Sequence, residues 1–171
     1  MKPVGLFFTG GVESTLLLYQ LSKDIGEINL YTVTNPYINL DRIETIVSYV
    51  NELCGVKNVT PFLIPWNKDT GDRTFIRWAR HLASVELSKL YIGSNERMDH
   101  LPKRKYVEHE NILIPFRHVK KDEIVKTYVE NSMLELLFLT HSCFSDKNTH
   151  CNMCQGCEER QLAFERNNLY E

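Results

Sequence analysis

Four cysteines near the C-terminal end of the sequence have the spacing of a metal site. Cys143, Cys151, Cys154 and Cys157 form a C-x7-C-x2-C-x2-C pattern. Four thiolates this close together are typical of a closed tetrahedral zinc site with a structural role. An iron–sulfur cluster is the alternative, because C-x2-C-x2-C is also one of its spacings, although the Cys-Pro that completes the bacterial ferredoxin run is absent. The sequence therefore favours a zinc ion over an iron–sulfur cluster.

Three further residues bear on this cluster. His141 and His150 flank the cysteines, and each could replace a thiolate, but we expect both rings to face solvent. The fifth cysteine, Cys54, is distant in sequence and fits a helical core position. The odd cysteine count thus indicates metal ligands and one core residue rather than a disulfide framework.

A second candidate site lies near the N-terminus, where a short apolar run ends in T-G-G-V-E-S-T at residues 9–15. Paired glycines let backbone N–H groups approach an anion, and the N-terminus of a following helix adds unpaired donors and partial positive charge. The segment therefore fits a phosphate-binding turn, although it is neither a dinucleotide fingerprint nor a Walker A loop. The alternative is a tight strand-to-helix turn with Ser14 or Thr15 as the helix cap. Glu13 beside phosphates requires Mg²⁺ or a Lys/Arg to bridge the charges.

Alternating apolar segments predict the elements that position these two sites. Strands are expected at 4–8, 28–33, 59–64, 90–92 and, as a strand or extended connection, 112–115. Helices are expected at 13–21, at 40–54 with Gly55 as the stop, at 75–85 with Trp78 and Val85 inward, at 121–129 with Val129 inward, and at 158–167. Residues 95–111 are expected to form a long loop, with a substrate lid as the alternative. Strands that alternate with helices predict an α/β fold with a mostly parallel sheet.

Composition limits the function classes. A length of 171 residues with no linker or repeat predicts one domain over 1–171, with 140–171 as a cysteine module and closing helix. Twenty Lys and Arg against 22 Asp and Glu argue against direct binding of long nucleic acid. No segment resembles a targeting signal or a membrane span, so we expect a cytoplasmic protein.

The N-terminal segment resembles the pyrophosphate-binding loop (S-G-G-x-D-S) of the PP-loop ATP pyrophosphatases. Thr9 stands here for Ser and Glu13 for Asp, which keeps each functional group and changes its reach. Members of that superfamily split ATP between the α and β phosphates. The resemblance implies a Rossmann-like, adenine nucleotide alpha hydrolase-like fold and a set of ATP-binding residues: Phe8, Thr9, Gly10, Gly11, Val12, Glu13, Ser14 and Thr15.

The N-terminal loop and the C-terminal cysteine pattern together resemble those of 7-cyano-7-deazaguanine synthase, the QueC family. Residues 140–144 (T-H-S-C-F), 151–160 (C-N-M-C-Q-G-C-E-E-R) and 163–164 (A-F) look like that family's T-x-S-C-[YF], C-G-x-C-x-x-C-x-x-R and [AG]-F. Gly93-Ser94-Asn95 with Asp99 resembles its G-x-N-x-x-D turn, and 115–124 resembles P-L-x-x-L-S-K-A-E-I. The segment 72–74 (D-R-T) stands where the family has an Arg-Asn pair.

The resemblance implies an ATP-dependent carbon–nitrogen ligase that releases AMP and pyrophosphate, with ATP, Mg²⁺ and Zn²⁺ as cofactors. It would convert 7-carboxy-7-deazaguanine and ammonia to the nitrile or its amide. Ser14 would bind pyrophosphate, Glu13 would hold Mg²⁺ or a bridging cation, and Arg73 and Lys121 would meet the charge that develops as pyrophosphate leaves. Solvated side chains are the alternative for Arg73 and Lys121.

Two family segments are altered here. The Y-G-Q segment after the second strand appears only as residues 37–39 (Y-I-N), and the Y-P-D-C-R segment has no counterpart in 100–110. A PP-loop enzyme with another substrate, including tRNA thiolation, and a non-catalytic ATP- and zinc-binding module therefore stay open. We expect a small-molecule partner, a deazapurine carboxylate with ammonia, and leave a homodimer open.

Overall fold

The computed structural model describes residues 2–58, 61–66, 72–97 and 106–170, without the side chains of 72–74. In these residues five parallel strands form one sheet in the order β3-β2-β1-β4-β5. The strands are β1 (Val4–Phe7), β2 (Asn29–Thr34), β3 (Phe62–Pro65), β4 (Lys89–Ile92) and β5 (Ile112–Leu113). The predicted α/β fold with a mostly parallel, Rossmann-like sheet is confirmed.

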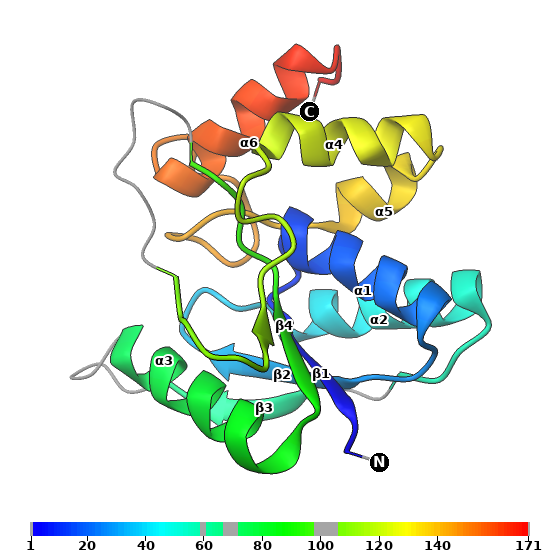
Figure 1. The fold of residues 1–171 in the computed structure, drawn as a ribbon. Helices are drawn as coiled ribbons and strands as arrows, with labels where there is room; N and C mark the ends of the chain where they lie inside the picture. Colours follow the sequence, from blue (N-terminus) through cyan, green and yellow to red (C-terminus); the bar gives the residue numbers. More distant parts are fainter. Residues whose placement is uncertain (1, 59–60, 67–71, 98–105, 171) are drawn as a thin grey trace.

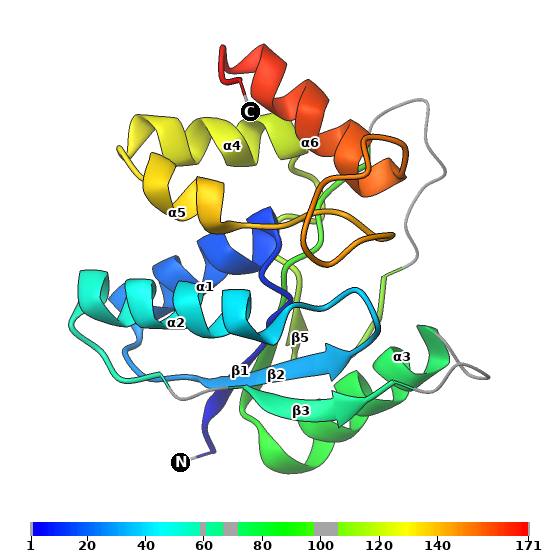
Figure 2. The ribbon, with the colours of Figure 1, turned by 180° about the vertical axis from the view of Figure 1, so that it is seen from behind.

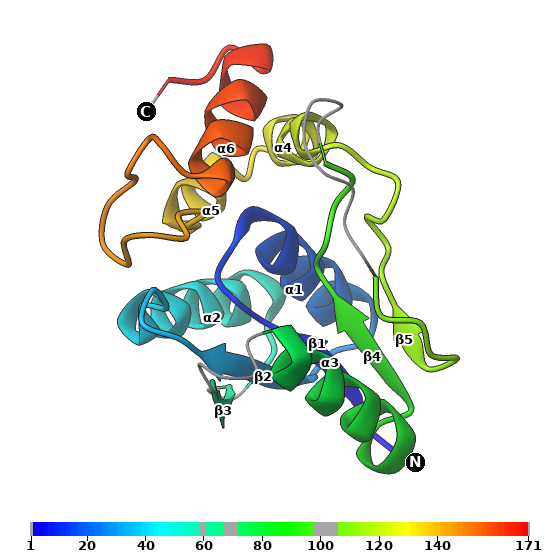
Figure 3. The same cartoon turned by 90° about the vertical axis from the view of Figure 1, so that its left-hand side faces the viewer.

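Helices cover both faces of this sheet (Figure 1). They are α1 (Val12–Asp24), α2 (Leu40–Cys54), α3 (Asp72–His81), α4 (Lys121–Glu130), α5 (Leu134–Leu139) and α6 (Gln155–Arg166). The helices α1 and α2 pack on one face and α3 on the other, while α4, α5 and α6 form a further layer beyond α1 and α2 (Figures 1, 2 and 3). No helix among the described residues is both long and apolar enough to cross a bilayer.

The alternation of side chains along β1 explains why the sheet is buried on both faces. Leu6 and Phe8 point into the larger core with α1, α2, α4, α5 and α6, whereas Phe7 points into the smaller core with α3. Such two-sided burial is typical of parallel strands and accounts for the continuous apolar run. The end of β1 lies between β2 and β4, where the chain's strand order reverses, and ligands of open α/β sheets bind at this position.

Most expected elements occur, with shifted ends. Gly55 caps α2 in the left-handed conformation, with φ of 68°, as expected for a helix stop. The helix α6 begins at Gln155, three residues earlier than predicted, and α5 was not predicted as a helix. Residues 95–97 and 106–111 contain no helix or strand, which agrees with the predicted loop, while 98–105, including Asp99, lie outside the described residues.

Three side chains that were predicted to point into the core are exposed, so these predictions were wrong. Trp78 is 39% exposed, because it lies at the edge of the face of α3 on which Phe75 and Ala79 contact the smaller core. Val85 is 57% exposed, because α3 ends at His81 and continues as a π-helical turn, Leu82–Glu86. The wider turn rotates the following residues away from the face that a 3.6-residue period predicts. Val129 is 37% exposed, since it lies in the last turn of α4, beyond the buried face that Ile124 and Tyr128 form.

Candidate functional site

The loop between β1 and α1 is closed by its own hydroxyl groups. Gly10 adopts φ of 71°, a left-handed conformation that favours glycine. The Thr9 and Ser14 side-chain oxygens lie 3.1 Å apart, and Ser14 Oγ donates to the Gly11 carbonyl at 3.2 Å. The N-cap of α1 is Gly11, with no side-chain cap, so the alternative in which Ser14 or Thr15 caps the helix was wrong. The hydroxyls are grouped at a helix N-terminus, where phosphate oxygens are bound in many proteins.

Glu13 and Lys121 form an ion pair beside this loop. Lys121 Nζ lies 3.0 Å from Glu13 Oε1 and 3.6 Å from Glu159 Oε2, and the side chains of all three residues are nearly buried. Lys121 is the first residue of α4 and Glu159 belongs to α6. The carboxylate in the loop is therefore bridged by a lysine, one of the two arrangements expected for a carboxylate near phosphates.

Backbone contacts fix the position of the loop. The Tyr128 hydroxyl donates to the Val12 carbonyl at 2.8 Å, and the His141 N–H donates to the Gly10 carbonyl at 2.9 Å. Burial raises the pKa of Tyr128 well above its ordinary value, so the phenol stays protonated and remains a donor. The helix α4 and the segment before the cysteines thus hold the start of α1 from two sides.

Gly93, directly after β4, lies against the first turn of α1, and no larger residue fits there. A Cβ on Gly93 would lie 2.6 Å from Ser14 N and 2.7 Å from Ser14 Cα, both backbone atoms that cannot turn aside. We expect Gly93→Ala to displace the loop, to destabilise the protein by about 1–3 kcal/mol and to weaken nucleotide binding. Urea unfolding and calorimetric titration with ATP measure the two effects. The control is Gly26→Ala, where a Cβ meets nothing within 4 Å although φ is 95°; it should lose stability but keep ATP affinity, and equal affinity losses would contradict the prediction.

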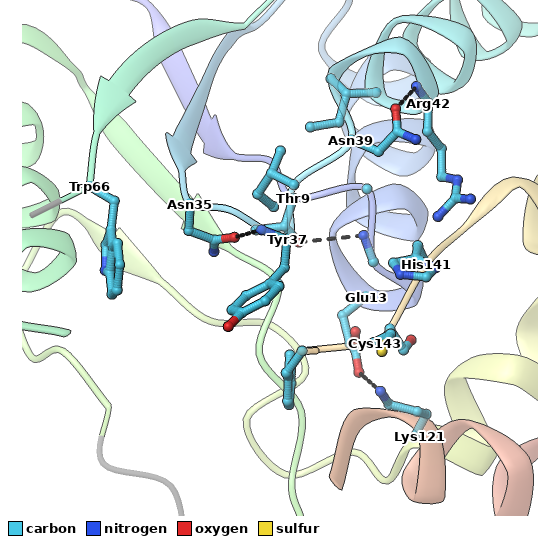
Figure 4. Close-up of a pocket in the computed structure, with 17 residues that line it drawn as sticks. Thr9, Glu13, Asn35, Tyr37, Asn39, Arg42, Trp66, Lys121, His141 and Cys143 are labelled. Carbon is cyan, nitrogen blue, oxygen red and sulfur yellow. Dashed lines mark hydrogen bonds and ion pairs between the residues drawn. The ribbon is translucent and has the colours of Figure 1, made fainter. Parts of the chain in front are cut away.

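A cavity of about 450 Å³ lies between this loop, the segment after β2 and the segment 141–144. Its walls differ in chemistry (Figure 4): the Glu13–Lys121 pair lies on one side, Tyr37 and Trp66 on another, and Arg42 and His141 on a third. Aromatic rings, cationic side chains and a loop that contributes the Thr9 hydroxyl together suit a flat ring system joined to phosphates.

The four predicted cysteine ligands come together at the edge of this cavity. The sulfur atoms of Cys143, Cys151, Cys154 and Cys157 all lie within 4.8 Å of one another, with Cys151–Cys157 and Cys143–Cys154 at 3.9 Å. Four sulfurs at this spacing fit a tetrahedral ion with bonds of about 2.3 Å. The cluster is therefore compatible with zinc.

Backbone N–H groups surround the sulfurs, as expected around thiolates. Ser145 and Asp146 donate to Cys143 Sγ, and Phe144 donates to Cys154 Sγ, at 3.3–3.4 Å. Backbone hydrogen bonds, chiefly from the Met153 N–H, lower the pKa of Cys151 to about 6, whereas burial raises the pKa of Cys157 to about 12. Cys157 is therefore a neutral thiol in the absence of an ion, and binding of a cation would remove its proton because coordinated thiols are deprotonated.

One turn of the cysteine segment uses a left-handed residue. Asn152 has φ of 56° and stands where the QueC pattern C-G-x-C has Gly. Asparagine is, after glycine, one of the residues that most readily adopt this conformation. The turn between the second and third cysteines can therefore form with Asn152 in place of the family's Gly.

The cysteine module is held tightly to the rest of the protein. Arg160 is 1% exposed, donates to Thr140 Oγ1 at 2.7 Å and lies over the Phe164 ring. Arg42, at the start of α2, donates to the backbone carbonyls of Lys147 and Asn148. The module and the cavity wall are therefore one packed unit.

The two flanking histidines were predicted wrongly. His141 and His150 are half-buried rather than solvent-facing, and their ring centroids lie 4.7 Å apart. Burial lowers the pKa of His141, and its Nε2 lies 2.7 Å from the Asp146 carbonyl, so this nitrogen carries the hydrogen. The cause is the docking of residues 141–150 against the loop, which sequence spacing does not reveal. Cys54 is half-buried and packs against the larger core, as expected for a helix residue.

The predicted site residues divide into three groups. The loop residues 8–15 and Lys121 lie together at the ends of β1 and β4, and the cysteines lie beside them. Arg73 is in the first turn of α3, but its side chain is outside the described residues. The structure adds residues that sequence reasoning missed: Glu159, Arg42, Trp66 and His141 as a wall residue. Glu159 carried a signal, since a carboxylate on the buried face of a helix requires a partner.

Comparisons with known proteins found similarity to the QueC family. Residues 88–168 match the family model described as "Queuosine biosynthesis protein QueC". Three proteins named 7-cyano-7-deazaguanine synthase are similar: 28% identical over 105 residues in Pseudoalteromonas atlantica, 38% over 55 in Nautilia profundicola and 41% over 58 in Sulfolobus acidocaldarius. These matches span 53%, 32% and 34% of this chain and 48%, 24% and 12% of the relatives. The matched part is thus less than half the length of each relative.

A structure described as a predicted subunit of tRNA methyltransferase from Methanocaldococcus jannaschii has a similar fold. Its TM-score is 0.50 at 17% sequence identity, with 76% of this chain and 75% of that chain covered. At this identity the likeness concerns the fold alone. The chain is similar to the QueC proteins over these segments, and the predicted resemblance is confirmed.

Proposed function

We propose that this relative of QueC is an ATP-dependent carbon–nitrogen ligase that converts 7-carboxy-7-deazaguanine and ammonia to 7-cyano-7-deazaguanine or its amide. The observation that carries the proposal is the meeting of three features at one cavity: the hydroxyl-rich loop, the Glu13–Lys121 pair and the cysteine module. The relatives named as synthases support the substrate class. In this proposal the protein positions reactants and stabilises charge rather than forming a covalent bond itself.

The first half of the reaction would activate the carboxylate. A carboxylate oxygen attacks the α-phosphorus of ATP, the bond to the β-phosphate oxygen breaks, and pyrophosphate leaves with the electron pair. The N-terminal turn of α1 and the Ser14 hydroxyl would bind the departing phosphates, and Lys121 would meet the charge that develops on them. Mg²⁺, where bound at Glu13, would neutralise phosphate charge.

The second half would install nitrogen. Ammonia attacks the activated carbonyl carbon, AMP leaves, and one proton lost from nitrogen gives the amide. A second ATP then adenylates the amide oxygen with release of pyrophosphate, and loss of AMP and two protons from nitrogen leaves the nitrile. Arg73 stays a candidate for phosphate charge on the basis of its place in the sequence.

Turnover tests the proposal directly. We expect the purified protein with ATP, Mg²⁺, ammonia and the carboxylic acid to form AMP and the nitrile. Ser14→Ala removes a donor near the departing phosphates and should lower AMP formation about 10²-fold. Liquid chromatography with mass detection measures AMP, amide and nitrile together.

Ser48→Ala is the matched control, because Ser48 is exposed on α2 outside the cavity. It should retain wild-type turnover. Absence of AMP in the wild type, or equal rates for Ser14→Ala and wild type, would refute the proposal. Accumulation of the amide would restrict the product to the first half-reaction.

A further inference from the structure

Lys121 lies between two carboxylates that face different surroundings. Glu13, at 3.0 Å, and Lys121 itself line the cavity, whereas the Glu159 side chain, at 3.6 Å, is 1% exposed and belongs to α6. The lysine side chain is 5% exposed. One carboxylate thus meets Lys121 at the cavity and the other meets it from the protein interior.

Glu159 is a charged residue on the buried face of α6. The buried face of α6 consists of Gly156, Cys157, Glu159, Arg160, Ala163 and Phe164. Replacing buried ion pairs with apolar residues is often neutral or stabilising, so packing alone does not explain a carboxylate here. Its second contact with a lysine that lines the candidate phosphate site gives it an electrostatic role.

The sign of that role follows from Coulomb's law. A polyphosphate in the cavity repels Glu13 and attracts Lys121, while Glu159 attracts Lys121 toward the interior and adds a negative charge on the far side of the lysine. In a site of low dielectric constant, one such charge changes anion affinity substantially. Glu159 therefore lowers the affinity of the site for pyrophosphate while it keeps the buried ammonium paired.

We propose that Glu159 is a positioning residue that holds Lys121 from the protein side and limits how tightly the site retains pyrophosphate. This inference rests on the proposed function, because it takes the cavity to bind the phosphates of ATP. Its consequence is a faster release of pyrophosphate, a step that limits turnover in many enzymes.

Calorimetric titration with inorganic pyrophosphate and Mg²⁺ tests the inference without turnover. Glu159→Gln keeps the shape and removes the charge, and we expect it to bind pyrophosphate about tenfold more tightly than wild type. Glu159→Asp restores the charge and should bind within about threefold of wild type. Glu165→Gln makes the same charge change at an exposed position of α6 and should leave affinity unchanged.

Steady-state AMP formation supplies a second readout. Glu159→Gln should lower both kcat and the KM for ATP, since tighter retention of pyrophosphate slows release, whereas a purely structural defect would raise KM. Thermal unfolding confirms that each variant is folded at the assay temperature. Weaker or unchanged pyrophosphate binding by folded Glu159→Gln, or an equal gain in Glu165→Gln, would overturn the inference and leave the proposed function standing. If the wild type binds neither pyrophosphate nor ATP, both fail.

Discussion

Removal of the metal from the cysteine cluster should weaken ATP binding by about 10²-fold or more. Structural zinc contributes about 10–16 kcal/mol to the folding of isolated zinc-binding peptides, which is comparable to the whole stability of a typical domain. Residues 141–144 form one wall of the cavity, and the His141 N–H donates to the Gly10 carbonyl in the loop between β1 and α1. Loss of order in the cysteine module therefore removes a wall and a loop contact together.

Dialysis against a chelator, followed by titration of zinc during calorimetry with ATP, measures this effect. Cys154→Ala should reproduce it genetically. Cys54→Ala is the matched control, because Cys54 lies in α2, outside the cluster, and it should keep one metal per chain and wild-type ATP affinity. Full ATP affinity in the metal-free protein would contradict the prediction. Elemental analysis with a visible absorption spectrum identifies the ion, because an iron–sulfur cluster is coloured and zinc is colourless.

Substitution of Lys121 is the second change with a large expected effect. Lys121→Gln leaves two buried carboxylates, Glu13 and Glu159, without the shared ammonium. Removing one partner of a buried ion pair costs about 3–5 kcal/mol, and AMP formation should fall about 10²-fold because a positive charge at the phosphates is lost. Urea unfolding and AMP release measure the two losses separately.

A second substitution makes this prediction specific. Lys121→Gln/Glu159→Gln should recover part of the lost stability, since one of the two buried carboxylates that lost this ammonium is removed, while activity stays low. Lys126→Gln, which breaks an exposed pair with Glu130 on the same helix, should change stability by less than about 0.5 kcal/mol. Equal stability of the Lys121→Gln and Lys126→Gln variants would contradict the prediction that the buried ion pair stabilises the fold.

The parts of the fold that depend on local pattern could be predicted from sequence. The apolar run of β1 and the end of α2 at Gly55 follow from rules that involve neighbouring residues only. The failure at Val85 has a physical reason: a π-helical turn adds one residue to a turn, and the local sequence gives no sign of it.

The site could be predicted to the same extent. The loop between β1 and α1 and the cysteine cluster are local motifs, so their residues could be identified from the sequence. The structure places both beside one cavity. Glu159 and Arg42 act on residues far away in the chain, and sequence spacing carries no information about such contacts. His141 was misjudged for the same reason, because its environment is made by the docking of one segment on another.

The hydrogen bond from the His141 N–H to the Gly10 carbonyl also bears on the order in which the chain folds during its synthesis. The loop after β1 leaves the ribosome early, whereas its partner segment and α6 leave late. At the usual elongation rates this delay is on the order of ten seconds. During that interval Glu13 has neither Lys121 nor the cysteine module beside it, and the start of α1 is exposed to water. A cavity that needs both the loop after β1 and residues 141–144 is therefore complete only after the later segment has left the ribosome.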